Sequence, residues 1–162
     1  NVGDAKSGGF EVEASAQPTS ALQFKLNASY TDSRITRPDV GFPARLQAGL
    51  PGAPHFSAGA SFLYRQRIAH DVSATASLRS MYVGKSNIAF MRQRELQIGD
   101  YTITDARLAL SHGTLEGAIY SDNLTNEWSS TYSYGNPIRF GGAGMITPLR
   151  PRLMGVELKQ AF

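Results

Sequence analysis

Apolar and polar residues alternate with a period of two along most of this sequence, and this pattern constrains the fold more than any other feature. Between Leu22 and Tyr30 every even position is apolar and every odd position is polar. Successive side chains of a strand point to opposite faces, so this segment is predicted to be a strand with one apolar face. No run of roughly 18 apolar residues occurs, which excludes a helical membrane span.

The same alternation recurs in six further segments, one of which has a break at Leu63 on its polar side. These segments are residues 10–16, 56–65, 72–79, 105–111, 115–120 and 154–159. The sequence therefore predicts an all-β chain of about seven strands, without a convincing helix.

Short and long connections alternate strictly between the predicted strands. Tight turns are expected at 17–20, where Pro18 stands, at 69–71 and at 112–113; long connections are expected at 32–54, 85–100 and 122–150. A transmembrane barrel has this asymmetry, with short periplasmic turns and long external loops. A soluble sandwich has no reason to keep its long loops at one end. We therefore expect an antiparallel transmembrane β-barrel segment.

The aromatic residues give an independent check once the tight turns are assigned to the periplasm. We then expect a girdle at the outer ends of the strands and a second one at the inner ends. The outer set is Phe10, Tyr30, Phe56, Tyr82 and Tyr101, and the inner set is Tyr64 and Phe162. Such girdles are typical of amphipathic rings at the two membrane interfaces.

Seven strands cannot form a complete barrel. An odd number places the two chain ends on opposite sides of the membrane and leaves two open edges in hydrocarbon, where unpaired backbone groups are costly. We therefore expect further strands upstream. The first four residues lack the basic start and apolar run of a signal peptide, so the signal of an exported protein is also expected upstream.

Several segments, in their order and spacing, resemble the C-terminal part of TonB-dependent outer-membrane receptors. Residues 1–11 are similar to small and polar residues that run into a GxE strand. Residues 26–32 (LNASYTD) are similar to a strand of these receptors, and 50–54 (LPGAP) to a loop that precedes a downward strand. Residues 122–127 (DNLTNE) resemble the NLTN element, and Pro151-Arg152 with the last strand resembles the final segment. Gln160 departs from the pattern, which has an aromatic residue there.

The resemblance implies that residues 1–162 are the C-terminal part of a barrel of about twenty-two strands, without its plug domain and earlier strands. It implies a receptor in the cell outer membrane of a Gram-negative bacterium that takes up a scarce solute actively, in dependence on TonB. A ferric siderophore is the first expectation, and cobalamin and oligosaccharides are alternatives.

The partners that follow from the resemblance are the lipid bilayer with its lipopolysaccharide, and the plug domain and strands missing from the chain. The TonB complex would contact the absent N-terminal region. The barrel-assembly machinery would recognise the last strand, in which Phe162 is the predicted assembly signal.

Cationic and aromatic residues share the long loops and are our candidates for ligand binding. They are Arg92, Arg94, Trp128, Tyr132, Tyr134 and Arg139. Together they suit an anionic, partly aromatic ligand such as a ferric chelate. The simpler alternative is that exposed loops are polar and that aromatic residues pack on the barrel rim.

Other chemistry is not expected. His55 is predicted at the outer end, and His70 and His112 at the periplasmic end, so they predict no metal site. Glu11 and Glu13 are interpreted as a hydrated lumen wall. No catalytic arrangement and no cofactor are indicated. No nucleic-acid surface is indicated either, because the basic residues are scattered along the sequence.

Two other functions remain open on the sequence. One is a passive outer-membrane channel or small stand-alone barrel, since an eight-stranded barrel needs about this length. The other is a soluble β-sandwich used for adhesion or binding.

Overall fold

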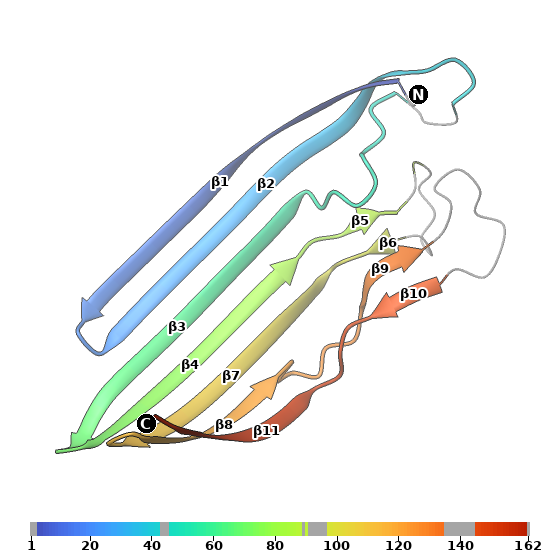
Figure 1. The fold of residues 1–162 in the computed structure, drawn as a ribbon. Helices are drawn as coiled ribbons and strands as arrows, with labels where there is room; N and C mark the ends of the chain where they lie inside the picture. The colour runs from blue at the N-terminus through green and yellow to red at the C-terminus, as the bar shows by residue number, and fades with distance from the viewer. Residues whose placement is uncertain (1–2, 43–45, 89, 91–96, 135–144, 162) are drawn as a thin grey trace.

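A computed structural model describes residues 3–42, 46–88, 90, 97–134 and 145–161. All regular elements in this part of the chain are strands, and it contains no helix long and apolar enough to span a membrane. Seven strands form one antiparallel sheet in the order β1-β2-β3-β4-β7-β8-β11 (Figure 1). They are β1 (Gly3–Thr19), β2 (Leu22–Pro38), β3 (Phe56–Ala69), β4 (Val72–Val83), β7 (Tyr101–His112), β8 (Leu115–Asp122) and β11 (Leu153–Gln160).

The predicted seven-stranded antiparallel sheet is therefore confirmed. Each strand pairs with the next strand of this sheet along the chain, so no connection crosses over another strand. The three tight turns leave only residues 20–21, 70–71 and 113–114 between strands, and they lie at one end of the sheet. The described parts of the three long connections, 39–55, 84–100 and 123–152, lie at the other end (Figure 1).

Two predicted boundaries were wrong. The first turn was expected at 17–20, but β1 continues through Pro18 to Thr19. A register shift between Ala16 and Thr19 lets the chain pass this residue, which has no N–H to donate to the ladder. The first long connection begins after Pro38, because β2 runs on past Asp32.

Beyond Tyr30, where the pairing with β3 stops, the edge of β2 is met by its own returning loop. The Ile35 N–H donates to the Ala48 carbonyl at 2.8 Å, and the Leu50 N–H donates to the Ser33 carbonyl at 3.0 Å. The Ile35 side chain lies at this junction and is fully buried. The periodicity gave no sign of this packing, since residues 47–50 do not alternate.

Two short hairpins in the long connections were not predicted from the sequence. One pairs β5 (Ser86–Asn87) with β6 (Gln97–Ile98), and the other pairs β9 (Ser130–Tyr134) with β10 (Met145–Pro148). They are too short, and their alternation too weak, to be recognised by periodicity.

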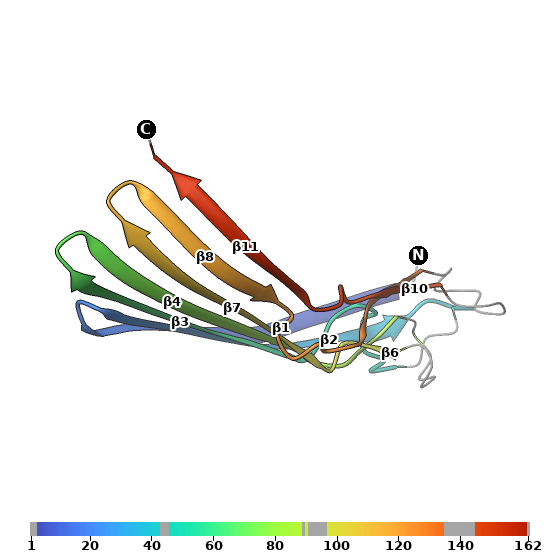
Figure 2. The same cartoon turned by 90° about the horizontal axis from the view of Figure 1, so that it is seen from below.

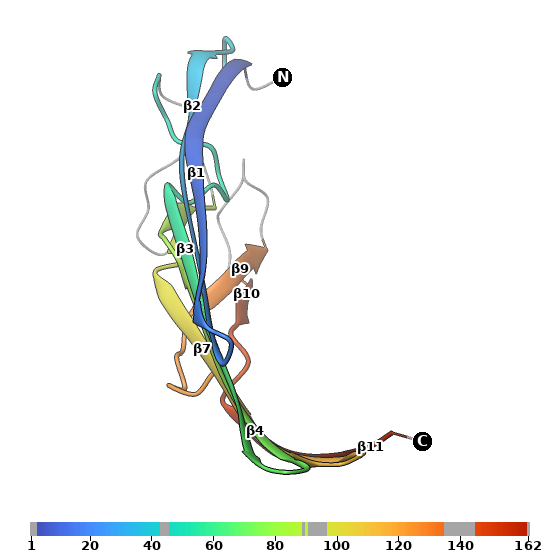
Figure 3. The same cartoon turned by 90° about the vertical axis from the view of Figure 1, so that its left-hand side faces the viewer.

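The sheet is bent across its width. Figures 2 and 3 show β8 and β11 rising out of the surface that contains β1 and β2. β1 and β11 are the edges, and each pairs with one neighbour only. Five buried apolar residues are found in the described part of the chain, so little of the apolar surface lies in an internal core.

Candidate functional site

The register divides the side chains of the sheet into two faces. Residues directly opposite each other share a face, and an uninterrupted polar row links Ser15, Lys25, Ser61, Arg79 and Asp105. We call the face that contains this row the polar face, and the opposite one the apolar face. The predicted alternation is thus a property of the whole sheet.

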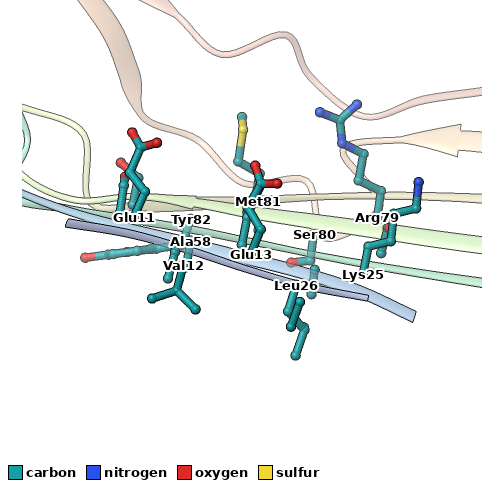
Figure 4. A pocket seen from close by; sticks show the side chains of 18 of the residues that line it. Glu11, Val12, Glu13, Lys25, Leu26, Ala58, Arg79, Ser80, Met81 and Tyr82 are labelled. Carbon is teal, nitrogen blue, oxygen red and sulfur yellow. The ribbon is translucent and has the colours of Figure 1, made fainter. Parts of the chain in front are cut away.

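The polar face is the concave one. In Figure 4, Glu11, Glu13, Lys25 and Arg79 point to one side of the sheet, while Val12 and Leu26 point to the other. The C-terminal segments, in faint orange, lie on the side of the charged groups. A hollow of about 810 Å³ lies over β1–β4, with the two glutamates, Lys25 and Arg79 in its lining.

A charge network spans the polar face at β7, β8 and β11. The Arg107 guanidinium donates to Glu116 at 2.7 Å and to Glu157 at 3.2 Å. The other oxygen of the Glu157 carboxylate pairs with Lys159. Two cations and two anions are therefore balanced across three strands. Periodicity placed these residues on a polar face, but only the register shows which of them meet.

The apolar face exposes a broad hydrophobic surface. Leu26 is 57% exposed, Ile119 is 57% exposed and Val156 is 82% exposed, although the three belong to β2, β8 and β11. Soluble monomers rarely leave so extended an apolar surface in contact with water. The face therefore requires an apolar environment.

A row of aromatic residues crosses the apolar face. Phe10 stacks on Tyr30 with ring centroids 5.6 Å apart, and Phe56 lies 6.1 Å from Tyr82. The register places Phe10, Tyr30 and Phe56 side by side. These four girdle residues lie in the predicted row, although β1 and β2 extend well beyond it toward the long loops.

The prediction for Tyr101 was wrong. It stands opposite Val83 on the polar face, and its side chain is buried. Its odd position in β7 puts it on the face of Asp105 and Arg107, which the alternation already implied. Tyr64, predicted for the inner girdle, stands on the apolar face opposite Leu22, next to the first tight turn.

The long connections contact one another at their end of the sheet. The Gly52 N–H donates to the Asn87 carbonyl at 2.7 Å, which joins the first to the second. The Ser129 hydroxyl donates to the Gly99 carbonyl at 3.1 Å, which joins the third to the second. These contacts join the described parts of the three long connections at this end of the sheet.

Asn123 organises the start of the third long connection. It is buried and has a φ of 49°, a left-handed conformation that Asn tolerates. Its amide donates to the carbonyls of Glu127 at 2.9 Å and Arg150 at 2.8 Å, and its side-chain oxygen accepts the Glu127 N–H. Its own N–H donates to Asp105 at 3.0 Å. The NLTN element noted in the sequence is thus the link between β8 and the segment that leads to β11.

A second polar cluster lies where β4 and β7 meet the long loops. The Lys85 ammonium lies 2.9 Å from the Asp100 carboxylate, and the Tyr82 hydroxyl donates to the same group at 3.1 Å. Both hydrogen bonds stabilise the charged form, so the pKa of Asp100 is lowered, chiefly by Lys85. Asp100 therefore remains an anion at every physiological pH.

The predicted ligand residues can be placed only in part. Trp128 lies in the third long connection with its side chain 73% exposed. Tyr132 and Tyr134 belong to β9, but the placement of their side chains lies outside the described residues. Arg92, Arg94, Arg139 and the predicted assembly signal Phe162 also lie outside them. The grouping of these residues into one site therefore stays a prediction.

The histidines occupy opposite ends of the sheet, as predicted. The His55 ring lies 6.3 Å from the Tyr30 ring at the long-loop end. His70 lies in the second tight turn, and His112 is the last residue of β7, next to the third. Within the described ranges no three His, Cys, Asp or Glu side chains form a potential metal site. Ser111, which precedes His112 in the sequence, has its hydroxyl within hydrogen-bonding distance of the Ser73 hydroxyl on β4, at 2.9 Å.

Comparison with known proteins bears on the fold. No protein-family model and no curated protein sequence matches the chain. Among solved structures, the ferric yersiniabactin uptake receptor FyuA from Yersinia pestis is similar over 100% of this chain, with a TM-score of 0.82 and 21% identity. The siderophore receptor PiuA from Acinetobacter baumannii is similar over 98%, with a TM-score of 0.74 and 18% identity.

The match is partial from the side of the solved proteins. This chain spans 24% of the FyuA chain and 22% of the PiuA chain. The seven-stranded sheet thus has the fold of a part of these siderophore receptors, and the resemblance noted in the sequence is supported at the level of fold.

Proposed function

We propose that the chain is the C-terminal part of the barrel of a TonB-dependent outer-membrane receptor that takes up a scarce solute, with a ferric siderophore as the preferred class. The observation that carries the proposal is the two-faced sheet with all its long connections at one end. Its fold matches siderophore receptors over the whole chain.

The two faces suit the two environments of a barrel wall. The apolar face, with its aromatic row, would contact lipid, and the aromatic rings would lie at the outer interface. The polar face, with the Arg107 network, would line a hydrated interior. The tight turns would then face the periplasm and the long loops the outside, where lipopolysaccharide and solute are met.

Solute binding would take place at the long-loop end. Contacts between the three connections support a common binding layer, and Trp128 offers an exposed ring there. Arg92, Arg94 and Arg139 would add charge for an anionic chelate. Active transport would require the plug domain and its contact with the TonB complex, which lie outside this sequence. The mechanism would be tight external binding followed by TonB-driven movement of the plug.

Uptake measured on the complete protein tests this function. The complete gene is introduced into a strain that lacks its own siderophore receptors, and uptake of radioactive iron is followed with a panel of ferric siderophores. We expect uptake of at least one complex, and its loss in a strain without TonB. Arg92→Ala with Arg94→Ala should weaken that uptake.

Two results would contradict the proposal. Uptake that persists without TonB would favour the passive channel. A protein extracted without detergent would contradict the membrane wall itself and favour a soluble β-sandwich.

A further inference from the structure

Four basic side chains gather on the polar face of β2, β3 and β4, although they are far apart in the sequence. They are Lys25, Arg65, Arg67 and Arg79, and we call them the basic track. Lys25 and Arg79 both stand opposite Ser61, so they share one level of the sheet. Arg65 and Arg67 follow along β3 toward the tight turns. The track thus descends from the middle of the sheet to the end that would face the periplasm.

The charges of the basic track are not balanced by the strands that carry them. All four side chains are exposed, and none makes an ion pair with any residue that the structure describes. The polar face of β2, β3 and β4 carries no acidic residue. Arg107 on β7 differs, because it contacts two glutamates.

The neighbouring acidic groups lie at the margins of the track. Asp105 stands opposite Arg79, but its carboxylate accepts the Asn123 N–H at 3.0 Å and makes no ion pair with Arg79 among the described contacts. Glu11 and Glu13 lie on β1 farther toward the long-loop end, and Asp122 lies at the upper end of the track. Asp71, in the turn after β3, contacts the His70 ring at 3.0 Å and makes no ion pair with Arg65 or Arg67 among the described contacts. A compensating anion for the lower part of the track must therefore come from outside this sheet.

The residues between the basic groups indicate what kind of anion fits. Ser73 and Thr75 stand opposite Arg67 and Arg65, and Ser61 lies between the two upper cations. Protein–protein interfaces depend on aromatic or large apolar anchors, and Leu63 is the one large apolar side chain here. Small hydroxyl groups between cations suit a hydrated small anion better than an acidic protein surface.

A hollow is present at the upper end of the track. It measures about 500 Å³. Lys25, Ser61 and Arg79 contribute to its lining on one side, and Asp105, Arg107 and Asp122 contribute on the other. In Figure 4, Lys25 and Arg79 extend to the same side of the sheet. Their charged ends are therefore available to a solute on the concave side.

We propose that the basic track binds anionic solutes, bearing carboxylate or phosphate oxygens, and leads them along the inner wall toward the tight-turn end. A wall with charge of one sign concentrates counter-ions near it. The inference rests on the proposed function in one respect, since the polar face must line a water-filled interior. It adds a place on the inner wall, away from the long loops, where an anionic solute is bound.

Charge-selective quenching of a fluorophore tests this inference in the complete protein, reconstituted in lipid vesicles. These 162 residues contain no cysteine, and in a complete protein with any other cysteine replaced by serine, Thr75→Cys places a single neutral dye opposite Arg65. Iodide, caesium and neutral acrylamide serve as quenchers. At low ionic strength we expect iodide, corrected for its intrinsic efficiency, to quench about threefold more than caesium. Added salt should reduce this preference.

Three variants show whether the track causes the preference. Arg65→Gln with Arg67→Gln should remove it, whereas Arg65→Lys with Arg67→Lys should keep it. Arg37→Gln is the control, because Arg37 is 84% exposed at the far end of β2 and its ion pair among the described residues is with Asp4. It removes one positive charge from the protein and should leave the quenching at position 75 unchanged.

The possible failures are distinguishable. Equal quenching by iodide and caesium, with full access of acrylamide, would overturn the anion track and leave the barrel wall intact. A dye shielded from acrylamide and also from lipid-borne quenchers would show that protein covers the track, which overturns the small-anion inference. A dye quenched only from the lipid would contradict the proposed function itself.

Discussion

Asn123 shows how one residue can fix a junction between strands and loops. A side-chain amide has two donors and one acceptor, and Asn123 uses all three on backbone groups of Glu127 and Arg150. Its left-handed φ is one that few other residues adopt without strain. The sequence motif identified the element, but the reason for Asn became visible only when the partners were located.

Replacing Asn123 by Ala should destabilise the protein by about 2–4 kcal/mol, because three part-buried hydrogen bonds to backbone groups are lost together. Asn126→Ala is the matched control: its φ is also positive, at 55°, but among the described contacts its side chain accepts a single hydrogen bond, from the Arg152 N–H. That variant should cost about 1 kcal/mol. Urea unfolding of the complete protein in lipid measures both values, and equal losses would refute the role assigned to Asn123.

Gly155 provides a second test at this scale. A Cβ atom added there would lie 2.5 Å from the Tyr120 ring, which covers the glycine from β8. Gly155→Ala should therefore displace the ring and cost about 1 kcal/mol. Gly117 has no heavy atom within 4 Å of its added Cβ, so Gly117→Ala should cost nothing measurable. Unfolding in urea compares the pair, and a larger loss for Gly117→Ala would contradict the packing described.

At the scale of the elements, a period of two was sufficient to predict seven strands and both faces, because each strand is exposed to a different environment on each side. It was not sufficient for Tyr101, whose ring suggested a girdle although its position assigned it to the polar face. The basic track was also missed. The alternation assigns Arg65 and Arg79 to the polar sides of their strands, but only the register shows that they are neighbours on the sheet.

A charge introduced on β2 tests the two environments. Leu26→Arg places a cation in the middle of the apolar face and should destabilise the protein by about 2–4 kcal/mol. Asn27→Arg introduces the same side chain on the polar face opposite Glu13, where less than about 1 kcal/mol is expected. Both are measured by unfolding in lipid vesicles. Similar losses at the two positions would contradict the division of faces.

At the scale of the whole molecule, the odd number of strands has a consequence for closure. β1 and β11 run in the same direction, so two copies joined edge to edge through them would create a parallel pair. An all-antiparallel barrel therefore needs an odd number of strands from elsewhere. The solved receptors, of which this chain spans about a quarter, provide a pattern for such strands.

The central claim is that the sheet is a wall between lipid and water, and spin labels along β4 test it most directly. Single cysteines at positions 73–78 of the complete protein in vesicles each carry a label. Collisions with oxygen should be most frequent at 74, 76 and 78, and collisions with a polar nickel chelate at 73, 75 and 77. Equal accessibility at odd and even positions, or the opposite phase, would contradict the claim.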